Sequence, residues 1–250
     1  MPLHSQYGCS IDLPVQQKEV ALDKNVLRHE LKYVLSDADY LWLRDRLMAF
    51  MPLDSNADAA TRGYHIRSLY FDDPENTALF EKTNGDEYRE KFRIRTYRAT
   101  GDIVLEKKSK VVYYTSKQSA KMSRGQCDRL LSGDADALLE SDSPLMREFY
   151  AKMRSRVLRP KVIVDYWREA YLYPAGNIRI TFDRDLHSGN YSLDLFSERT
   201  SAVPVMEPGT MVMEVKYDNL FPPHIKALIQ GLNAQRLAVS KYVLCRRFHG

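Results

Sequence analysis

The stretch 89-REKFRIRTYRATGDIVLEKKSK-110 alternates charged and apolar residues on both sides of a Thr100-Gly101-Asp102 turn. Successive side chains of a strand point to opposite faces of a sheet, so the alternation predicts two strands with one charged and one apolar face. The charged positions are Lys91, Arg93, Arg95, Glu106, Lys108 and Lys110, and the apolar positions are Phe92, Ile94, Ile103 and Leu105. The stretch therefore predicts a hairpin with a row of cations on one side and an apolar layer on the other.

Positive charge is concentrated around this hairpin. The 250 residues carry a net charge of only +4, with 44% hydrophobic and 28% charged residues, as in an ordinary soluble globular protein. Between Arg89 and Lys121, in contrast, basic residues clearly outnumber acidic ones. Like charges on neighbouring sites of a sheet are unfavourable unless an anion lies among them, so the local pattern predicts an anionic ligand.

Cysteine usage and the lack of targeting patterns bear on the compartment. Cys9, Cys127 and Cys245 are an odd number without C-x-x-C spacing, which argues against a disulfide framework and a zinc site. The first residues match neither a signal peptide nor a transit peptide, and no stretch approaches the ~18 apolar residues of a membrane span. We therefore expect a cytoplasmic protein that reaches a membrane only through a partner.

Periodicity along the chain predicts one domain over residues 26–250, preceded by an N-terminal arm at residues 1–25. Besides the hairpin, we expect strands at 28–36, 65–73, 160–173, 177–186 and 210–218, and helices at 37–51, 75–84, 123–133, 143–157 and 221–234. Ser36 and Ser123 are the expected helix caps, and Pro160 is expected to end the helix before it. Lys117 is expected at a loop tip.

The same alternation in the other strands indicates an antiparallel sheet. Arg179 and Asp183 alternate with apolar residues, whereas parallel strands covered on both faces form continuous apolar runs. Two architectures fit this pattern. One is an α+β sandwich with a solvated charged face, and the other is a closed antiparallel barrel with helices outside and a charged lumen. The concentration of like charges favours the barrel.

Converging arginines and lysines are suited to bind phosphate groups. Arginine supplies bidentate hydrogen bonds and lysine a compact charge, and phosphoryl transfer needs mainly positioning and electrostatic stabilisation. Carboxylates on the charged faces are candidate ligands for Mg²⁺ or Mn²⁺, namely Glu30, Glu106 and Glu214. The chain has no Walker motif and no G-x-G-x-x-G, so side chains on strands must hold any nucleotide.

A family resemblance extends this interpretation. The chain resembles the vacuolar transporter chaperone (VTC) polyphosphate polymerase domain, a member of the triphosphate tunnel metalloenzyme superfamily, over about residues 26–245. The motifs are RHELKY, SLYFDD, FRIRTY, LEKKSK, TSKQSAKMS, PKVIVDYWREAY, IRITFD, MEVKY and SKY. The resemblance implies an α+β fold with a closed antiparallel barrel, in which a metal ion, Mn²⁺ or Mg²⁺, helps transfer the γ-phosphoryl group of ATP to a growing inorganic polyphosphate chain.

The resemblance also implies roles for individual residues. Positions that match phosphate contacts are Lys32, Arg93, Arg95, Lys108 and Lys121, and further basic tunnel positions are Arg168, Arg179 and Lys241. Glu214 matches the metal-binding carboxylate. The charged strand faces add Glu30 and Glu106 as candidate metal ligands, and they add substrate-binding candidates at Arg28, Lys91, Lys110 and Lys216.

Two departures from the family pattern bear on the reaction. Triphosphatases and cyclases of the superfamily carry E-x-E-x-K in the first strand, where this chain has Arg28-x-Glu30-x-Lys32. Hydrolysis with two metals needs several acids, so the loss of one carboxylate favours a polymerase. Ala238 stands where a further lysine is expected in the polymerases.

Two alternative functions remain open at this stage. One is a triphosphatase or polyphosphatase on the same scaffold, and the other is a non-catalytic module that binds a polyanion. Nucleic acid is not an expected partner, because no nucleic-acid motif or aromatic platform accompanies the basic strands. Tyr70, Tyr97 and Tyr166 are expected to pack rather than to stack on a base, and the histidines form no cluster. Nothing in the sequence indicates an oligomeric state.

Overall fold

The computed structural model of the protein describes residues 29–97, 101–112, 114–189, 191–197, 202–232 and 234–247. The predicted arm at residues 1–25 lies outside these ranges, and so does Arg28. The strands are β1 (His29–Ser36), β2 (Tyr64–Asp72), β3 (Tyr88–Tyr97), β4 (Ile103–Val111), β5 (Tyr114–Met122), β6 (Arg159–Tyr173), β7 (Ile178–Ser188), β8 (Val203–Pro204) and β9 (Thr210–Tyr217). The helices are α1 (Asp37–Leu47), α2 (Thr77–Asn84), α3 (Arg124–Leu131), the 3₁₀ helix η1 (Ala135–Glu140), α4 (Pro144–Ser155), α5 (Pro223–Gln230) and α6 (Lys241–Arg246).

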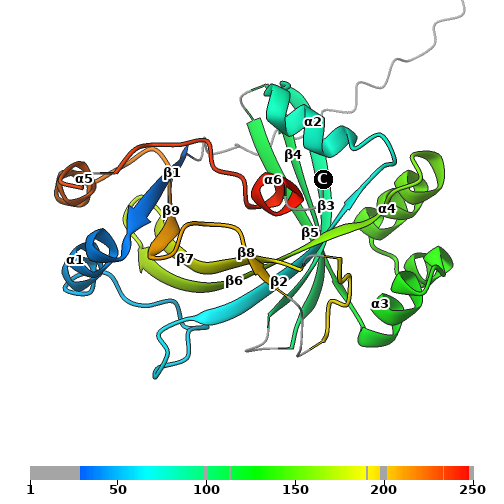
Figure 1. Cartoon of the computed structure of the whole chain (residues 1–250), viewed down its shortest axis with the longest axis horizontal. Coiled ribbons are helices and arrows are strands. Elements are labelled where there is room, and N and C mark those ends of the chain that lie inside the picture. The colour runs from blue at the N-terminus through cyan, green and yellow to red at the C-terminus, as the bar shows by residue number, and fades with distance from the viewer. Residues whose placement is uncertain are drawn as a thin grey trace, which may run out of the picture.

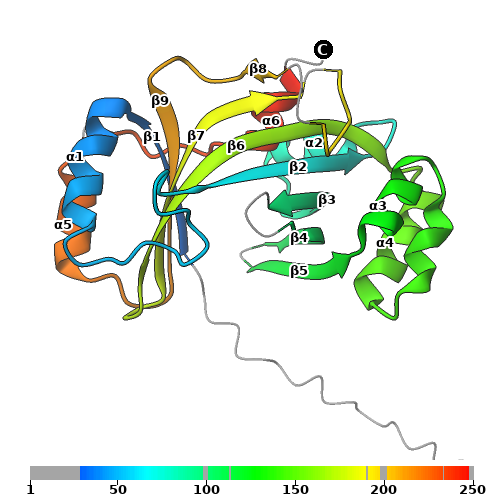
Figure 2. The ribbon, with the colours of Figure 1, turned by 90° about the horizontal axis from the view of Figure 1, so that it is seen from below.

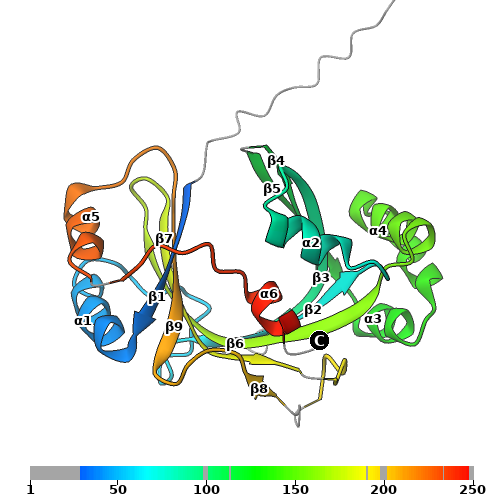
Figure 3. The same cartoon turned by 45° about the horizontal axis from the view of Figure 1, so that its top comes forward.

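The strands form one sheet, and all of its pairings between described strands are antiparallel, as the alternation predicted. The strand order is β1-β9-β7-β6-β2-β3-β4-β5, and the short β8 pairs with β7. The sheet curls strongly, so that β1 and β9 stand opposite β3, β4 and β5 across a concave side (Figure 3). This curvature brings strands from both ends of the sheet to one site.

The predicted closed barrel is wrong, because the sheet stays open between β1 and β5. The outer edge of β1 is used by the segment that precedes α6. Tyr33 forms a bridge with Arg236, and the Leu237 N–H donates to the Lys32 carbonyl at 2.9 Å. Since this segment occupies the edge that β5 would need, the observed α+β fold is a half-barrel with helices on its convex face.

Two groups of helices cover the convex face of the sheet (Figures 1 and 2), and an apolar core lies under each group. In the first, α3, η1 and α4 cover β2 to β5, and Phe149 of α4 packs against Phe71 and Phe92 with both ring centroids 5.0 Å away. In the second, α1 and α5 cover the other half through buried Leu43 and Ile225. These cores hold the apolar faces of the strands, which leaves the charged faces on the concave side.

The concave side is partly covered by α6 and α2, which lie next to each other (Figure 3). The Tyr242 ring of α6 stacks on Tyr70 of β2 with centroids 4.9 Å apart, and the Tyr242 hydroxyl donates to Asp72 at 2.6 Å. A third apolar cluster forms around these rings and includes Leu79 of α2. The C-terminal part of the chain therefore folds back over the charged face of the sheet.

Local signals place most helix ends as predicted. Ser36 accepts a hydrogen bond from the Asp39 N–H at the start of α1, and Ser123 forms a capping box with Gln126 at the start of α3. The helix predicted at 143–157 ends at Ser155, before Pro160, which lies inside β6. The expected loop tip at Lys117 is wrong, because this residue lies within β5.

The first core predicts a stability effect. Phe149→Ala is expected to lower the free energy of unfolding by about 3–5 kcal/mol, because the ring is fully buried between two other rings and its removal leaves a cavity. Urea unfolding followed by circular dichroism measures the loss. Leu139→Ala is the matched control, since the Leu139 side chain is exposed. Equal losses in the two variants would show that Phe149 does not organise this core.

Candidate functional site

The strand register places the predicted cations on one face of the sheet. Arg93 lies opposite Glu106 and Lys91 opposite Lys108 between β3 and β4, and Lys108 lies opposite Lys117 between β4 and β5. These pairs share the concave face with Ser68 and Tyr70 of β2, which lie opposite Arg95 and Arg93. The single face inferred from the alternation is confirmed for the hairpin.

Glu106 is the carboxylate at the centre of this half of the concave face. Its Oε2 accepts hydrogen bonds from Arg93 Nε and Nη2, both at 2.6 Å, and its Oε1 lies 2.5 Å from Lys117 Nζ. Arg95 Nη1 lies 3.7 Å from Oε2. Burial opposes the ionisation of Glu106, but Arg93, Arg95 and Lys117 outweigh it and lower the pKa of Glu106 to about 2. Glu106 is therefore ionised at neutral pH although only 3% of it is exposed.

Hydroxyl groups fix the two guanidinium groups from the other side. Tyr70 accepts a hydrogen bond from Arg93 Nη1 at 2.6 Å. Arg95 donates to Ser68 at 3.1 Å and to Tyr166 at 3.2 Å. The Tyr70 and Tyr166 rings pack in the apolar cluster under α6, as predicted, but their hydroxyls also serve as acceptors. Arg93 and Arg95 are thus held before any ligand binds.

The opposite half of the concave face is organised by Glu214 of β9. Three lysines surround its carboxylate, with Lys241 at 3.0 Å, Lys216 at 3.2 Å and Lys32 at 3.4 Å. Burial raises the pKa of Glu214, but these lysines, led by Lys241, hold it well below its usual range. Burial also lowers the pKa of Lys216, to about 8, although Glu214 opposes this. Glu214 therefore keeps several buried ammonium groups together.

Asp183 of β7 connects this cluster to Arg168 of β6. Arg168 donates to both Asp183 oxygens, at 2.6 and 2.7 Å, and Lys241 lies 2.6 Å from Oδ2. Asp183 is fully buried, and Arg168 and Lys241 hold its pKa below the usual range against the effect of burial. Lys241, on α6, thus joins Asp183 to Glu214.

Ion pairs also cross the opening between the two ends of the sheet. Lys108 of β4 lies 3.1 Å from Glu30 of β1, which in turn lies 3.0 Å from Lys32. Burial opposes the ionisation of Glu30, but Lys32, Lys108 and Lys216 lower its pKa to about 2. Side chains therefore connect the two ends of the sheet where backbone hydrogen bonds do not.

The predicted site residues that lie together on the concave face are Lys32, Lys91, Arg93, Arg95, Lys108, Lys110, Arg168, Arg179, Lys216 and Lys241. Lys108 is half exposed at the rim, with 52% of its side chain accessible. Lys121 is separate from the enclosed part, because 81% of its side chain is exposed on the edge strand β5, where it pairs with Asp102. Arg28 lies outside the described residues.

The three predicted metal ligands do not form one cluster. Within the described part of the chain, no group of three histidine, cysteine, aspartate or glutamate residues could hold a metal ion. Glu106 and Glu214 are each surrounded by cations instead. Mg²⁺ is commonly held by one or two carboxylates together with substrate phosphates, so a single carboxylate on this face is compatible with a metal that phosphate oxygens would also coordinate. Glu30, Glu106 and Glu214 as ligands remain a prediction.

Sequence reasoning missed several residues that complete the site. Asp183 was placed on a charged face but not recognised as the partner of Arg168. Asp54, from the loop before β2, binds Arg179 at 2.7 Å, and the Tyr64 hydroxyl accepts from the same guanidinium at 2.8 Å. No motif marks Asp54, because its contact is 125 residues away in sequence. The sequence could have indicated Asp183 as a site residue, since it lies on the same face of β7 as Arg179.

A comparison with protein families finds one matching model. The VTC domain model matches residues 27–248, which is nearly the whole chain. No curated protein matches the sequence at a significant level. The helices in the described ranges are all too short or too polar to cross a bilayer.

Solved structures align with this chain at low sequence identity. A protein from Hippeastrum, named as an adenylyl cyclase candidate with a dominant triphosphatase activity, aligns with a TM-score of 0.54 and 14% identity, over 87% of this chain and 94% of its own. A candidate adenylate cyclase from Vibrio parahaemolyticus aligns with a TM-score of 0.48 and 10% identity, over 88% of this chain and 98% of its own. The Hippeastrum protein shows that the fold is shared.

The Glu106 cluster predicts a pH-dependent contribution to stability. Glu106→Gln is expected to lower the free energy of unfolding at pH 7 by about 3–5 kcal/mol, because it leaves buried guanidinium groups without a counter-ion. Because the folded-state pKa is depressed to about 2, the contribution is complete above about pH 4.5 and is lost as pH falls towards 2. Urea titrations at pH 7 and pH 3 should therefore show a smaller difference from the wild type at pH 3.

Glu140→Gln is the control for this measurement. Glu140 is half exposed and pairs with Arg129 on the surface, so its loss should change stability by less than about 0.5 kcal/mol at either pH. A Glu106→Gln effect that stays constant between pH 7 and pH 3 would contradict the depressed pKa.

Proposed function

The chain belongs to the VTC domain family, and from this premise we propose that it is a metal-dependent phosphotransferase, specifically an ATP-dependent polyphosphate polymerase. Its substrates are ATP and inorganic polyphosphate. The growing chain accepts the γ-phosphoryl group of ATP on the concave face, and ADP leaves. The bond broken is that between the β–γ bridging oxygen and the γ-phosphorus, and a terminal polyphosphate oxygen forms the new bond.

The observation that carries this proposal is the convergence of cations from distant strands on one curved face. Arg93 and Arg95 of β3 lie on one half, and Arg168 and Lys241 lie on the other. Charge on the oxygens of a transferring phosphoryl group is stabilised by such donors, and their fixed positions avoid reorganisation during the reaction. A site with guanidinium and ammonium groups on two facing sides is suited to an extended chain of phosphates.

The carboxylates of the site keep these cations in place when no phosphate is bound. Glu106 holds Arg93 and Lys117, and Glu214 holds three lysines. Arg93 has further donors, and lysine carries three, so a phosphate oxygen can bind beside the carboxylate. The ion pairs thereby preorganise the site for substrate.

A divalent cation, Mn²⁺ or Mg²⁺, would neutralise charge on the phosphates when it is bound. Glu214 is the proposed ligand of this chain, with Glu30 and Glu106 as the other carboxylates within the same face. Lys216, Lys241 and Lys32 around Glu214 would then be shared with the phosphate oxygens. The cations of the chain bind and orient the phosphates, whatever the identity of the metal.

A triphosphatase is the second candidate, because the Hippeastrum protein with the same fold is named for that activity. The distribution of acids weighs against it here. Hydrolysis with two metals needs several carboxylates gathered at one point, whereas the described residues contain no such group of three possible metal ligands. The first strand also has Arg28 in place of one acid of the E-x-E-x-K signature.

Incubation of the protein with γ-labelled ATP and Mn²⁺ or Mg²⁺ tests these candidates. A ladder of labelled polyphosphate is expected. Labelled orthophosphate alone would indicate a triphosphatase, and unchanged ATP would indicate a non-catalytic module that binds a polyanion.

Loss of single cations from the site should reduce the rate strongly. Arg95→Ala and Lys108→Ala are expected to lower kcat/KM for polymerisation on the order of 100-fold, the effect of deleting one oriented electrostatic group. Lys226→Ala is the control, because Lys226 is exposed on α5 on the convex side. Initial rates against ATP concentration measure the effects, with circular dichroism to confirm folding. Equal small losses in all three variants would contradict an active site on the concave face.

The metal role of Glu214 predicts a change in metal dependence. Glu214→Asp keeps the charge that the surrounding lysines need but moves the carboxylate, so it should raise the Mn²⁺ concentration for half-maximal rate about tenfold or more. Glu214→Gln should abolish turnover. An unchanged Mn²⁺ dependence in Glu214→Asp would remove Glu214 from the metal site, even if the Gln variant fails to fold.

A further inference from the structure

Four cations at one rim of the concave face differ from those inside it. Lys82 comes from α2, Arg89 and Lys91 come from β3, and Lys110 comes from β4. Arg89 lies directly opposite Lys110 in the β3–β4 register. Like charges on directly opposite sites repel each other, so this rim, where β3 begins and β4 ends, carries an electrostatic cost.

The rim cations have no carboxylate partners within the described part of the chain. Arg89 donates only to the Asp86 carbonyl, and Lys91 lies over the Tyr242 ring, 4.8 Å from its centroid. Lys82 and Lys110 form no ion pair with any described carboxylate. Cations inside the face, such as Arg93, Arg168 and Lys241, each bind a carboxylate. All four rim side chains are half buried, which makes their lack of partners costly.

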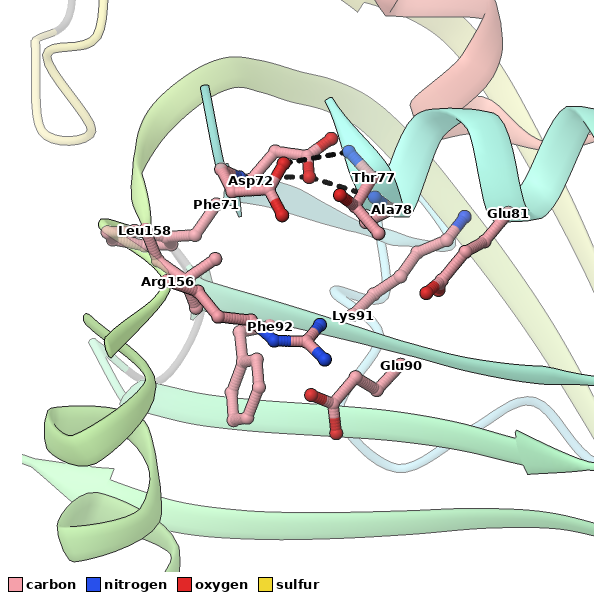
Figure 4. Close-up of a pocket in the computed structure, with 11 residues that line it drawn as sticks. Phe71, Asp72, Thr77, Ala78, Glu81, Glu90, Lys91, Phe92, Arg156 and Leu158 are labelled. Carbon is pink, nitrogen blue, oxygen red and sulfur yellow. Dashed lines mark hydrogen bonds between the residues drawn. The ribbon is translucent and has the colours of Figure 1, made fainter. Parts of the chain in front are cut away.

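Lys91 shows this cost most clearly. Its side chain lines a small pocket between α2 and β3, and Figure 4 shows it directed towards α2 and away from the Glu90 carboxylate. Glu90 is engaged by Lys107 and Lys152 on the other face. Burial, together with Lys82 and Arg89, lowers the pKa of Lys91 to about 7. The cations around it are Lys82, Arg89, Lys108, Lys32 and Arg156, the acids that line the same pocket are Asp72, Asp73, Glu81 and Glu90, and the Tyr242 ring lies below.

We propose that Lys82, Arg89, Lys91 and Lys110 form a rim subsite for the part of an extended linear oligophosphate that lies beyond a triphosphate. This inference rests on the proposed function. The rim is continuous with the interior site through Lys108. This residue lies opposite Lys91 of the rim and pairs with Glu30 of the interior site. An anionic chain that leaves the interior along β3 and β4 would meet four cations that form no ion pair with a described carboxylate. The subsite would therefore select polymeric over triphosphate substrates.

Binding of two probes separates the rim subsite from the interior site. Tripolyphosphate fills the interior only, whereas long-chain inorganic polyphosphate also reaches the rim. Lys82→Met and Arg89→Met are each expected to weaken binding of long-chain polyphosphate about tenfold, by removing charge-assisted hydrogen bonds. Their affinity for tripolyphosphate should stay within about twofold of the wild type. Lys226→Met is the matched control, and Arg95→Ala should weaken binding of both probes.

The outcomes distinguish failure of the subsite from failure of the proposed function. Equal losses for both probes would place the rim cations in the triphosphate site and overturn the subsite. Losses no greater than that of Lys226→Met would indicate diffuse attraction and also overturn it. A wild-type protein that binds neither probe would overturn the proposed function, and the subsite with it.

Stability supplies a second readout that a structural role of Lys91 would not give. Its pKa is about 7 in the folded protein and ordinary in the unfolded chain, so folding releases a proton between pH 7 and about 10.5. Lys91→Met is therefore expected to raise the midpoint of urea unfolding, most at low pH and progressively less as pH rises to 10.5. Lys226→Met should leave the midpoint unchanged. A Lys91→Met variant that is less stable than the wild type would make Lys91 a structural residue and overturn its place in the subsite.

Discussion

The fold depends on pairing buried guanidinium and ammonium groups with a few carboxylates. Glu106 holds Arg93 and Lys117, and Asp183 holds Arg168 and Lys241. A charge removed from water without a partner costs several kcal/mol, so a concave face with this many cations could not form without these acids. The apolar cores on the convex side supply the free energy that favours folding. The carboxylates reduce the free-energy cost of burying the cations on the concave side.

The same pairing explains how the site can be stable and still be suited to the anions that we propose as its substrates. A carboxylate between cations is a counter-ion that resembles a phosphate in charge and in its oxygen acceptors, so the cations are already oriented towards an anionic group. At the rim, Arg89 lies directly opposite Lys110, and burial and neighbouring cations lower the pKa of Lys91, so the charges of this region oppose folding. Strain and unfavourable charge of this kind are commonly retained where a ligand relieves them.

The open half-barrel leaves β5 as an edge strand of the sheet. β5 is an edge strand of nine residues, and unpaired edge strands are prone to pair with other chains. Lys117 and Lys121 on this strand oppose such pairing, because lysines placed side by side on two edges would repel. Lys117 also reaches Glu106, so the residue serves both the edge and the site.

Local sequence patterns predicted most of the strands, the two faces of the β3–β4 hairpin and the family, but not β5 and β8. Alternation from Lys91 to Lys110 identified the charged face because strand geometry forces neighbouring side chains to opposite sides. Contacts between residues far apart in the sequence became visible in the folded chain. The Lys108–Glu30 pair across the opening, the Arg179–Asp54 pair and the return of α6 with Lys241 follow from the curvature of the sheet. Local periodicity carries no information on curvature, so it could not show that the segment at Arg236 takes the edge of β1 and keeps the barrel open.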